Sequence, residues 1–470
     1  MHSHTKKNIL RISAALMLAV LAGCGGAPKT NSAAAEAYIT MPDKSMLLQK
    51  QDLVQSSVAD ATININAGTR YQVMDGFGFT LTGGSALHIS RMTPAARKQL
   101  LEELYGNGSS SIGVSYIRIS VGASDLDEKV FSYNDLPAGQ TDMALTKFDL
   151  GYDKQYLIPL LQQILKINPS VKILASPWSP PVWMKDNGDV RGGSLQPKYY
   201  SVYADYLVKY IQEMKKNGIT IDAITIQNEP LHPGNTPSLF MPADAQRDFI
   251  KNNLGPAFER NGISTKIIIY DHNADRPDYP ISILDDPQAK KYIDGSAFHL
   301  YGGEVNAISK VHNAHPDKNL YFTEQWVGAP GDFAKELSWH IENLIIGAPR
   351  NWCKTVLEWN LAADENQDPH TDRGGCDRCL GAVTITGDKV TREPAYYIIA
   401  QASKFVPSGS VRVESDMPAG IPNVAYVTPS GKTVVVLQNT SATDQNVMLK
   451  KGGPGNVVRL KAGAVATVVM

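Results

Sequence analysis

The sequence lacks a surplus of charge of either sign. It has 45 Lys and Arg residues against 46 Asp and Glu residues, which gives a formal net charge of −1. A nucleic-acid-binding protein normally carries a basic surplus, so this class of partner is disfavoured. The sequence also has no His-x-Glu-x-x-His metal motif and no Gly-x-x-x-x-Gly-Lys-Ser/Thr phosphate loop. We therefore expect neither a metal ion nor a bound nucleotide.

Cysteine is scarce, with four residues in 470. Cys376 and Cys379 are separated by two residues in a loop rich in Asp and Gly. A redox Cys-x-x-Cys pair normally opens a helix of a βαβ unit, so a structural disulfide is the favoured interpretation here. Cys353 is then left over, and the apolar run around it suggests that it is buried.

Long apolar runs are missing except near the N-terminus. There residues 12–21 follow Lys6, Lys7 and Arg11, as in a signal peptide, and are too few to span a bilayer. Small residues before Cys24 resemble a bacterial lipoprotein cleavage site, and an ordinary secretory signal is the alternative. We predict a signal peptide over 1–23, a lipidated Cys24 and a linker over 24–45. Export with a lipid anchor, in the outer membrane, is the expected localisation, and the sequence makes no prediction of oligomeric state.

The central part of the chain alternates apolar runs with amphipathic helical patterns. Such alternation is typical of parallel strands joined by helical crossovers. Eight units over residues 73–404 predict an α/β fold, a (β/α)8 TIM barrel, and a doubly wound open sheet is the alternative. The eight predicted strands are 73–81, 116–121, 171–175, 223–227, 266–270, 295–300, 319–323 and 355–359.

Helical patterns stop near residue 405. Six short alternating runs follow, separated by turns rich in Gly, Pro, Asn and Ser. This pattern predicts an accompanying antiparallel β-sandwich over residues 405–470. Residues 46–72 contain a further alternating run at 62–67, so we expect this N-terminal segment to add strands to the same sandwich.

Two glutamates stand where predicted barrel strands end. Glu229 follows the fourth strand within Asn228-Glu-Pro230, and Glu324 follows the seventh. Reactive groups of such barrels lie at these strand ends. Two facing carboxyl groups are what glycosidic cleavage requires, one as acid and one as nucleophile or base. We expect burial and the neighbouring carboxylate to raise the pKa of the acid. For either glutamate alone, a turn or surface position is the plainer interpretation.

Aromatic side chains stand at other predicted strand ends. Trp178 follows the third strand, His299 and Tyr301 the sixth, and Trp359 ends the eighth, while Trp326 lies two residues after Glu324. Sugar rings stack on aromatic faces, so these residues are candidate substrate-binding groups. Core packing is the alternative for any one of them.

With these positions in view, the sequence resembles glycoside hydrolase family 30, which includes lysosomal glucosylceramidase and microbial β-1,6-glucanases. The matching motifs occur in order along the chain: Asp75-Gly-Phe-Gly78, Tyr116-Ile-Arg-Ile119, Leu174-Ala-Ser-Pro-Trp-Ser-Pro-Pro-Val-Trp-Met-Lys185, Gln227-Asn-Glu-Pro230, Gln246-Arg-Asp-Phe249, Phe322-Thr-Glu324, Glu358-Trp-Asn-Leu361 and Ser403-Lys-Phe-Val-Pro407.

This resemblance implies a retaining mechanism without metal or organic cofactor. It implies that Glu229 is the acid/base and Glu324 the nucleophile. It further implies that Asn228 binds the sugar 2-hydroxyl and that Arg118 favours the ionised form of Glu324. Trp178 and Trp359 would line the glycone subsite, and His299 and Tyr301 would complete its wall.

One position departs from the family pattern. Many relatives carry an acidic residue where this chain has Gly83, so glycone recognition is expected to differ. Within the family, the lipoprotein features and the Cys376-x-x-Cys379 loop most resemble the β-1,6-glucanase branch. An exo-acting β-glucosidase or β-xylosidase, or a glucosylceramidase-like enzyme, is the alternative. A non-catalytic glycan-binding lipoprotein is disfavoured because both glutamates are present.

Overall fold

The computed structural model describes residues 35–53, 58–453 and 455–470. The predicted signal peptide and Cys24 lie outside the described residues, as does the first part of the predicted linker. Among the described residues, no helix is both long enough and apolar enough to span a bilayer.

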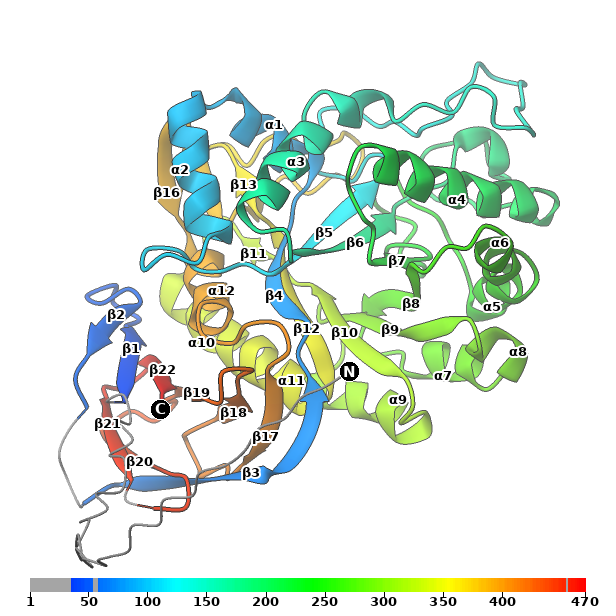
Figure 1. Ribbon diagram of the computed structural model, residues 1–470. Helices are drawn as coiled ribbons and strands as arrows, with labels where there is room; N and C mark the ends of the chain where they lie inside the picture. Colours follow the sequence, from blue (N-terminus) through cyan, green and yellow to red (C-terminus); the bar gives the residue numbers. More distant parts are fainter. Residues whose placement is uncertain (1–34, 54–57, 454) are drawn as a thin grey trace, which may run out of the picture. The chain divides into compact units, whose positions relative to one another are not determined.

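A closed barrel of eight parallel strands forms the larger part of the fold (Figure 1). Each strand is almost wholly buried, as is typical of a parallel sheet covered by helices. The order around the barrel is β10-β12-β4-β5-β6-β7-β8-β9. Each strand coincides with one of the eight predicted runs, so the barrel prediction is confirmed and the open sheet is excluded. The strands are β4 (Gly76–Thr80), β5 (Tyr116–Val121), β6 (Lys172–Pro177), β7 (Ala223–Thr225), β8 (Lys266–Asn273), β9 (Ile293–His299), β10 (Asn319–Glu324) and β12 (Cys353–Asn360).

Helices cover the outside of the barrel (Figure 1). Two of these helices, α3 (Leu157–Ile167) and α4 (Tyr200–Lys216), each bury an apolar face. The α-helices are α1 (Gly83–Arg91), α2 (Pro94–Tyr105), α3 (Leu157–Ile167), α4 (Tyr200–Lys216), α5 (Ala243–Phe249), α6 (Gly255–Arg260), α7 (Asp278–Leu284), α8 (Pro287–Lys290), α9 (Ile308–Ala314), α10 (Phe333–His340), α11 (Ala348–Arg350) and α12 (Pro394–Ser403). Short 3₁₀ and π segments are η1 (Gly151–Lys154), η2 (Val182–Met184), η3 (Pro197–Tyr199), η4 (Ile250–Leu254), η5 (Val305–Ala307) and η6 (Ile341–Gly347).

The second part of the fold is a β-sandwich with its own apolar core. Its strand order is β2-β1-β22-β19-β18-β17-β3-β20-β21. The six predicted C-terminal strands are all present, and the N-terminal segment joins them as expected. The strands are β1 (Glu36–Thr40), β2 (Gln49–Gln51), β3 (Ala61–Val73), β17 (Val411–Ser415), β18 (Asn423–Val427), β19 (Thr433–Gln438), β20 (Gln445–Lys450), β21 (Asn456–Leu460) and β22 (Val465–Val469).

Two details of the sandwich differ from the sequence predictions. The predicted linker 24–45 is wrong over β1, which pairs along its whole length with β22. The buried side chains of Ala37 and Ile39 explain this strand, because they complete the sandwich core. The sandwich is also not wholly antiparallel. The first residues of β3 pair in parallel with β20, and the later ones pair antiparallel with β17.

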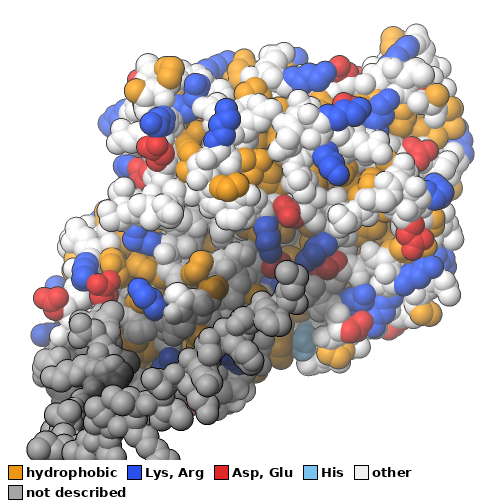
Figure 2. Space-filling view, in the orientation of Figure 1, with side chains coloured by type: hydrophobic (Ala, Val, Ile, Leu, Met, Phe, Trp, Pro, Cys, Tyr) orange, Lys and Arg blue, Asp and Glu red, His pale blue; other side chains and the backbone are white. Residues whose placement is uncertain are grey.

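Specific hydrogen bonds join the sandwich to the barrel. Arg350 of α11 donates to the carbonyl oxygens of Asn423 and Ser415, at 2.6 and 2.8 Å. On another element, Gln401 of α12 donates to Thr40 of β1 at 2.8 Å. Charged side chains of both signs are scattered over the face of the molecule in Figure 2, in keeping with the small net charge.

The interior of the barrel is built in layers, because side chains along a strand alternate in direction. One layer is apolar and takes one residue from each of seven strands: Tyr116, Leu174, Ala223, Ile268, Ala297, Tyr321 and Leu357. Two residues further along six of these strands stand Arg118, Ser176, Thr225, His299, Thr323 and Trp359. The layer nearer the carboxyl ends is therefore mostly polar, and it forms the floor of the site described next.

Candidate active site

Glu229 and Glu324 face each other at the carboxyl rim of the barrel. Glu229 follows β7 and Glu324 ends β10, and both are buried. A carboxylate oxygen of each and a ring nitrogen of His299 all lie within 4.8 Å of one another. Retaining glycosidases hold their two carboxyl groups about 5 to 5.5 Å apart, whereas inverting enzymes need about 6.5 to 9.5 Å. The observed approach of the two carboxylates is shorter than the inverting range and lies closest to the retaining one.

Arg118 of β5 lies beneath this pair and is fully buried. Its guanidinium donates to Glu324 Oε2 at 2.5 Å and to Asn228 Oδ1 at 2.7 Å. A third bond, of 2.9 Å, reaches Asp271 Oδ2. A buried cation needs such partners, and Arg118 in turn fixes the positions of Glu324 and Asn228.

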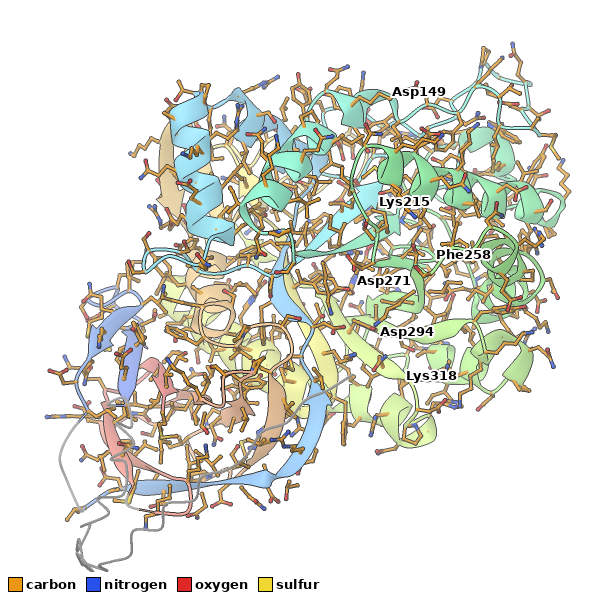
Figure 3. All side chains as sticks on the ribbon, viewed as in Figure 1. Asp149, Lys215, Phe258, Asp271, Asp294 and Lys318 are labelled. Carbon is orange, nitrogen blue, oxygen red and sulfur yellow. A yellow bond between two sulfur atoms is a disulfide. The ribbon has the colours of Figure 1, made fainter. Side chains whose placement is uncertain are left out.

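Asp271, on β8, is a site residue that the sequence prediction missed (Figure 3). It is fully buried and accepts hydrogen bonds from five side chains of the polar layer: Arg118, Ser176, Thr225, His299 and Thr323. Burial alone would raise the pKa of Asp271, but the charge of Arg118 and the hydrogen bond from His299 hold it well below its usual range. Asp271 is therefore the fixed negative charge around which the floor of the site is arranged.

His299 joins this charge to the glutamate pair. One ring nitrogen, Nε2, lies 3.1 Å from Asp271 Oδ1, and Nδ1 lies 3.2 Å from Glu229 Oε1 and 3.7 Å from Glu324 Oε1. Burial lowers the pKa of His299, but the charge of Glu324 and the bonds to Asp271 and Glu229 outweigh it and raise the pKa to about 9. At neutral pH the ring is an imidazolium that donates on both sides.

The charged ring changes the expected protonation of the pair. Burial raises the pKa of Glu229, but the hydrogen bond and charge of His299 outweigh it, so the pKa lies below its ordinary value. The expectation of a raised pKa at Glu229 is thus wrong for the unliganded site. At Glu324, burial raises the pKa, and the positive charges of His299 and Arg118 lower it. Repulsion from Glu229 adds to the effect of burial, so the net shift of the Glu324 pKa is upward. In the hydrogen bond between His299 and Glu229, the proton is therefore bound to the His299 ring and not to the carboxylate.

A cavity of about 440 Å³ opens above the glutamates. Trp178 and Trp359 form one wall, with ring centroids 5.4 Å apart, and the Arg118 guanidinium lies 4.9 Å from the Trp178 ring. The predicted residues that line the cavity are Trp178, Asn228, Glu229, Tyr301, Glu324, Trp326 and Trp359. Tyr301 also donates its hydroxyl to Glu324 Oε1 at 3.0 Å. Arg118 and His299 lie behind this lining and hold the glutamates from below.

A disulfide forms part of the same cavity. Cys376 and Cys379 are bonded to each other and both line the cavity, whereas Cys353 is free and buried. The bonded loop continues into β14 (Cys379–Leu380), which pairs with β11 (Val327–Gly328), just after Glu324. The disulfide thus ties one wall of the cavity to the segment that carries the nucleophile candidate. A small sheet of β13 (Ala362–Ala363), β15 (Val383–Thr386) and β16 (Lys389–Arg392) flanks this loop.

Two buried aspartates, Asp125 and Asp127, are relevant to Gly83, the position where many relatives carry an acidic residue. Asp125 lines the cavity from the loop after β5, and burial together with the charge of Glu324 raises its pKa to about 7. A side chain at Gly83 would collide with the carboxylate of Asp127, which occupies that space. An acid from the loop after β5, Asp127, therefore fills the space beside Gly83.

The protonation of buried groups predicts how stability depends on pH. Burial raises the pKa of Asp127 to about 7 and of Asp153 to about 8. Burial lowers the pKa of His340, but the negative charge of Glu358 has the larger, opposite effect and raises this pKa to about 9. The pKa of His299 is also about 9. All four groups hold their protons more tightly in the folded chain. Their stabilisation is complete below the unfolded pKa values, about 4 for Asp and about 6.5 for His, and is lost as pH rises through the folded values.

We accordingly expect the thermal unfolding midpoint to fall as pH is raised from about 5 to about 9. Calorimetry at constant ionic strength measures this. His340→Gln, which removes one of the titrating groups, should flatten the decline between about pH 7 and 9. A midpoint that stays level or rises over this range would contradict the assigned shifts.

The barrel, the buried carboxylate pair at retaining distance and the tryptophan wall together define a glycoside hydrolase. The chain belongs to glycosyl hydrolase family 30. The family's TIM-barrel domain matches residues 74–406, and its β-sandwich domain matches residues 409–468.

Named relatives include enzymes of two kinds. The chain is 35% identical over 397 residues to an endo-1,6-β-D-glucanase of Neurospora crassa, covering 80% of this chain and 81% of that protein. It is 30% identical over 410 residues to the lysosomal acid glucosylceramidase of Mus musculus, covering 80% and 76%. Among solved structures, the endo-β1,6-glucanase BT3312 is 34% identical, with a TM-score of 0.86 over 93% of this chain and 99% of that one.

Proposed function

We propose that the protein is a retaining β-glucanase that cleaves β-1,6-linked glucan. The observation that carries the reaction type is the buried pair Glu229 and Glu324, with oxygens within 4.8 Å. The linkage is supported by relatives named as endo-1,6-β-glucanases, which cover most of the chain at 33 to 35% identity.

In the first step, Glu324 attacks the anomeric carbon and forms a glycosyl ester. The bond from this carbon to the glycosidic oxygen breaks, and Glu229 delivers a proton to that oxygen. In the second step, Glu229 takes a proton from water. The water oxygen bonds to the anomeric carbon and Glu324 is released as a carboxylate. Two inversions at one carbon leave the β configuration unchanged.

His299 supplies the proton that Glu229 needs. The proton on Nδ1 lies in the 3.2 Å hydrogen bond to Glu229 Oε1. When a sugar fills the cavity and displaces water, the Glu229 carboxylate loses solvation and its proton affinity rises. Transfer along this bond then leaves a neutral imidazole whose Nε2–H still donates to Asp271. Glu229 is thereby protonated, and able to act as an acid, only when substrate is bound.

Other cavity residues are placed to bind the sugar. Arg118 donates a hydrogen bond to Asn228 Oδ1. The amide nitrogen of Asn228 has no protein partner among the described residues, so it can donate to the sugar 2-hydroxyl. Within the described part of the chain, the buried ring nitrogen of Trp178 likewise has no hydrogen-bond partner. Its ring and that of Trp359 offer apolar faces to the sugar, while Asp125 can accept from its hydroxyls.

A glucosylceramidase-like, exo-acting enzyme is the second candidate. The 30% identity to the mouse glucosylceramidase favours it. A non-catalytic glycan-binding role is less well supported, because both carboxylates and their hydrogen-bond partners are in place.

We further propose that the enzyme is exported and anchored by a lipid on Cys24, in the outer membrane. The support is the signal-like sequence before Cys24, with Gly25 following. Metabolic labelling with a fatty acid, in parent and Cys24→Ser chains, tests the anchor. Labelling of the parent alone is expected, and equal labelling of both would contradict it.

Incubation of the purified protein with linear β-1,6-glucan, with products resolved by size, tests the function. A ladder of short oligosaccharides is expected for cleavage within the chain. Glucose alone would instead support the exo-acting candidate. If β-1,6-glucan stays intact while a glucosylceramide is hydrolysed, the linkage assignment is wrong.

A further inference from the structure

A second cavity, of about 700 Å³, adjoins the catalytic cavity. The two share Tyr301 and Trp326 in their linings. Beyond these residues the second cavity is lined by Gln325, Glu336, Trp339 and Arg378, among others. Because these two residues line both cavities, the cavities lie next to each other at Trp326 and Tyr301.

The aromatic residues of the second cavity are unusually accessible. Trp339 of α10 and Tyr301 are both 40% exposed, although large apolar side chains are otherwise mostly buried in this protein. The Trp339 ring is held edge-on against His340, with centroids 5.1 Å apart. Trp326 packs over Gly328, where a Cβ would lie only 3.1 Å from the indole. Trp339 and Trp326 therefore each have a packing contact, and Trp339 and Tyr301 remain partly exposed.

Polar groups without partners lie beside these rings. Gln325 is 6% exposed, and its buried Oε1 has no hydrogen-bond partner among the described residues, which is costly unless a ligand supplies one. Arg378 donates through Nε and Nη2 to the Ala329 carbonyl oxygen. Its Nη1 has no protein partner within the described part of the chain. Open aromatic faces beside an amide, a guanidinium and the Glu336 carboxylate suit the alternating C–H and hydroxyl surface of a sugar.

We propose that this second cavity binds sugar residues of the glucan on the leaving-group side of the cleaved bond, with Trp339 as the stacking platform. The inference rests on the proposed function and deepens it. A subsite beyond the bond favours long chains over short ones, because binding energy from remote residues can be used at the reacting centre.

Chain-length dependence in Trp339→Ala tests the proposal. Two substrates are compared, a β-1,6-linked glucohexaose and 4-nitrophenyl β-gentiobioside, whose leaving group is a single aryl ring. We expect kcat/KM for the hexaose to fall about tenfold, equivalent to about 1.4 kcal/mol. For the aryl substrate it should stay within about twofold of the parent value, which also shows that the variant is folded.

Two further variants serve as controls. Trp339→Phe keeps an aromatic face and should retain most of the hexaose activity. Phe240→Ala removes an aromatic that is also 40% exposed but lines neither cavity, and it should leave both substrates unaffected.

Equal losses of Trp339→Ala on both substrates, or no loss on either, would overturn the subsite. Failure of the proposed function is read separately, in the parent enzyme. If the parent does not cleave the hexaose, the β-1,6-glucanase assignment falls, and this inference falls with it.

Discussion

Glu324→Gln is expected to lower kcat on β-1,6-glucan by at least about 10⁴-fold, because an amide cannot form the glycosyl ester. The change is nearly isosteric. The amide oxygen can still accept from Arg118, which also keeps its bond to Asp271 at 2.9 Å. The fold and much of the affinity for glucan should therefore survive.

Initial rates, thermal unfolding and calorimetric glucan binding measure these three quantities on one preparation. Glu304→Gln is a matched control, since Glu304 is an exposed glutamate in the loop after β9. It should have parent activity. Turnover by Glu324→Gln within tenfold of the parent would show that another group is the nucleophile.

Glu229→Ala should separate the two steps of the reaction. Loss of the acid is expected to cost about 10² to 10⁴ in kcat/KM on glucan, whose leaving group needs a proton. Aryl glycosides with a good leaving group need no proton to depart, so formation of the glycosyl ester from them should be much less affected.

Azide then distinguishes the roles of the two carboxylates. In Glu229→Ala, azide can attack the glycosyl ester in place of water, and the product should be a β-glycosyl azide. In Glu324→Ala, azide would take the place of the nucleophile and give the α-glycosyl azide. If the two variants give each other's products, the roles of acid and nucleophile are exchanged.

The barrel and the glutamate pair were predictable because both depend on local patterns. Strand runs such as 116–121 are short and mostly apolar, and the carboxyl ends of parallel strands meet at one rim. Any carboxylate directly after a strand is therefore brought close to the others. The disulfide loop could be found for a similar reason, since Cys376 and Cys379 lie too close in sequence to need knowledge of the fold.

Asp271 was not predicted as a site residue because an irregularity in the backbone of β8 turns its side chain into the barrel. Counting in twos from Ile268 of the apolar layer places Tyr270 in the polar layer. Instead, Tyr270 and Asp271 both have positive φ, at 74° and 64°, and the register with β9 shifts between Tyr270 and His272. Such a bulge turns Asp271 into the barrel. Backbone conformations of this kind concentrate at functional sites, and Glu229, with φ at 46°, is another example.

The location of the acid's proton also required the three-dimensional structure. The sequence suggested that a neighbouring carboxylate and burial would raise the pKa of Glu229. Three carboxylates instead surround the buried His299 ring, so the histidine takes the proton. Likewise, the packing at Gly83 depends on a loop 44 residues later, where Asp127 fills the space beside the glycine.

The configuration of the first product tests double displacement by Glu229 and Glu324 most directly. Reducing ends released from linear β-1,6-glucan can be followed by proton NMR in the minutes before mutarotation. Double displacement predicts that the β anomer appears first and that the α anomer grows in later at the rate of mutarotation. If the α anomer appears first, Glu229 and Glu324 do not act by double displacement. If no reducing ends are released, the substrate assignment fails.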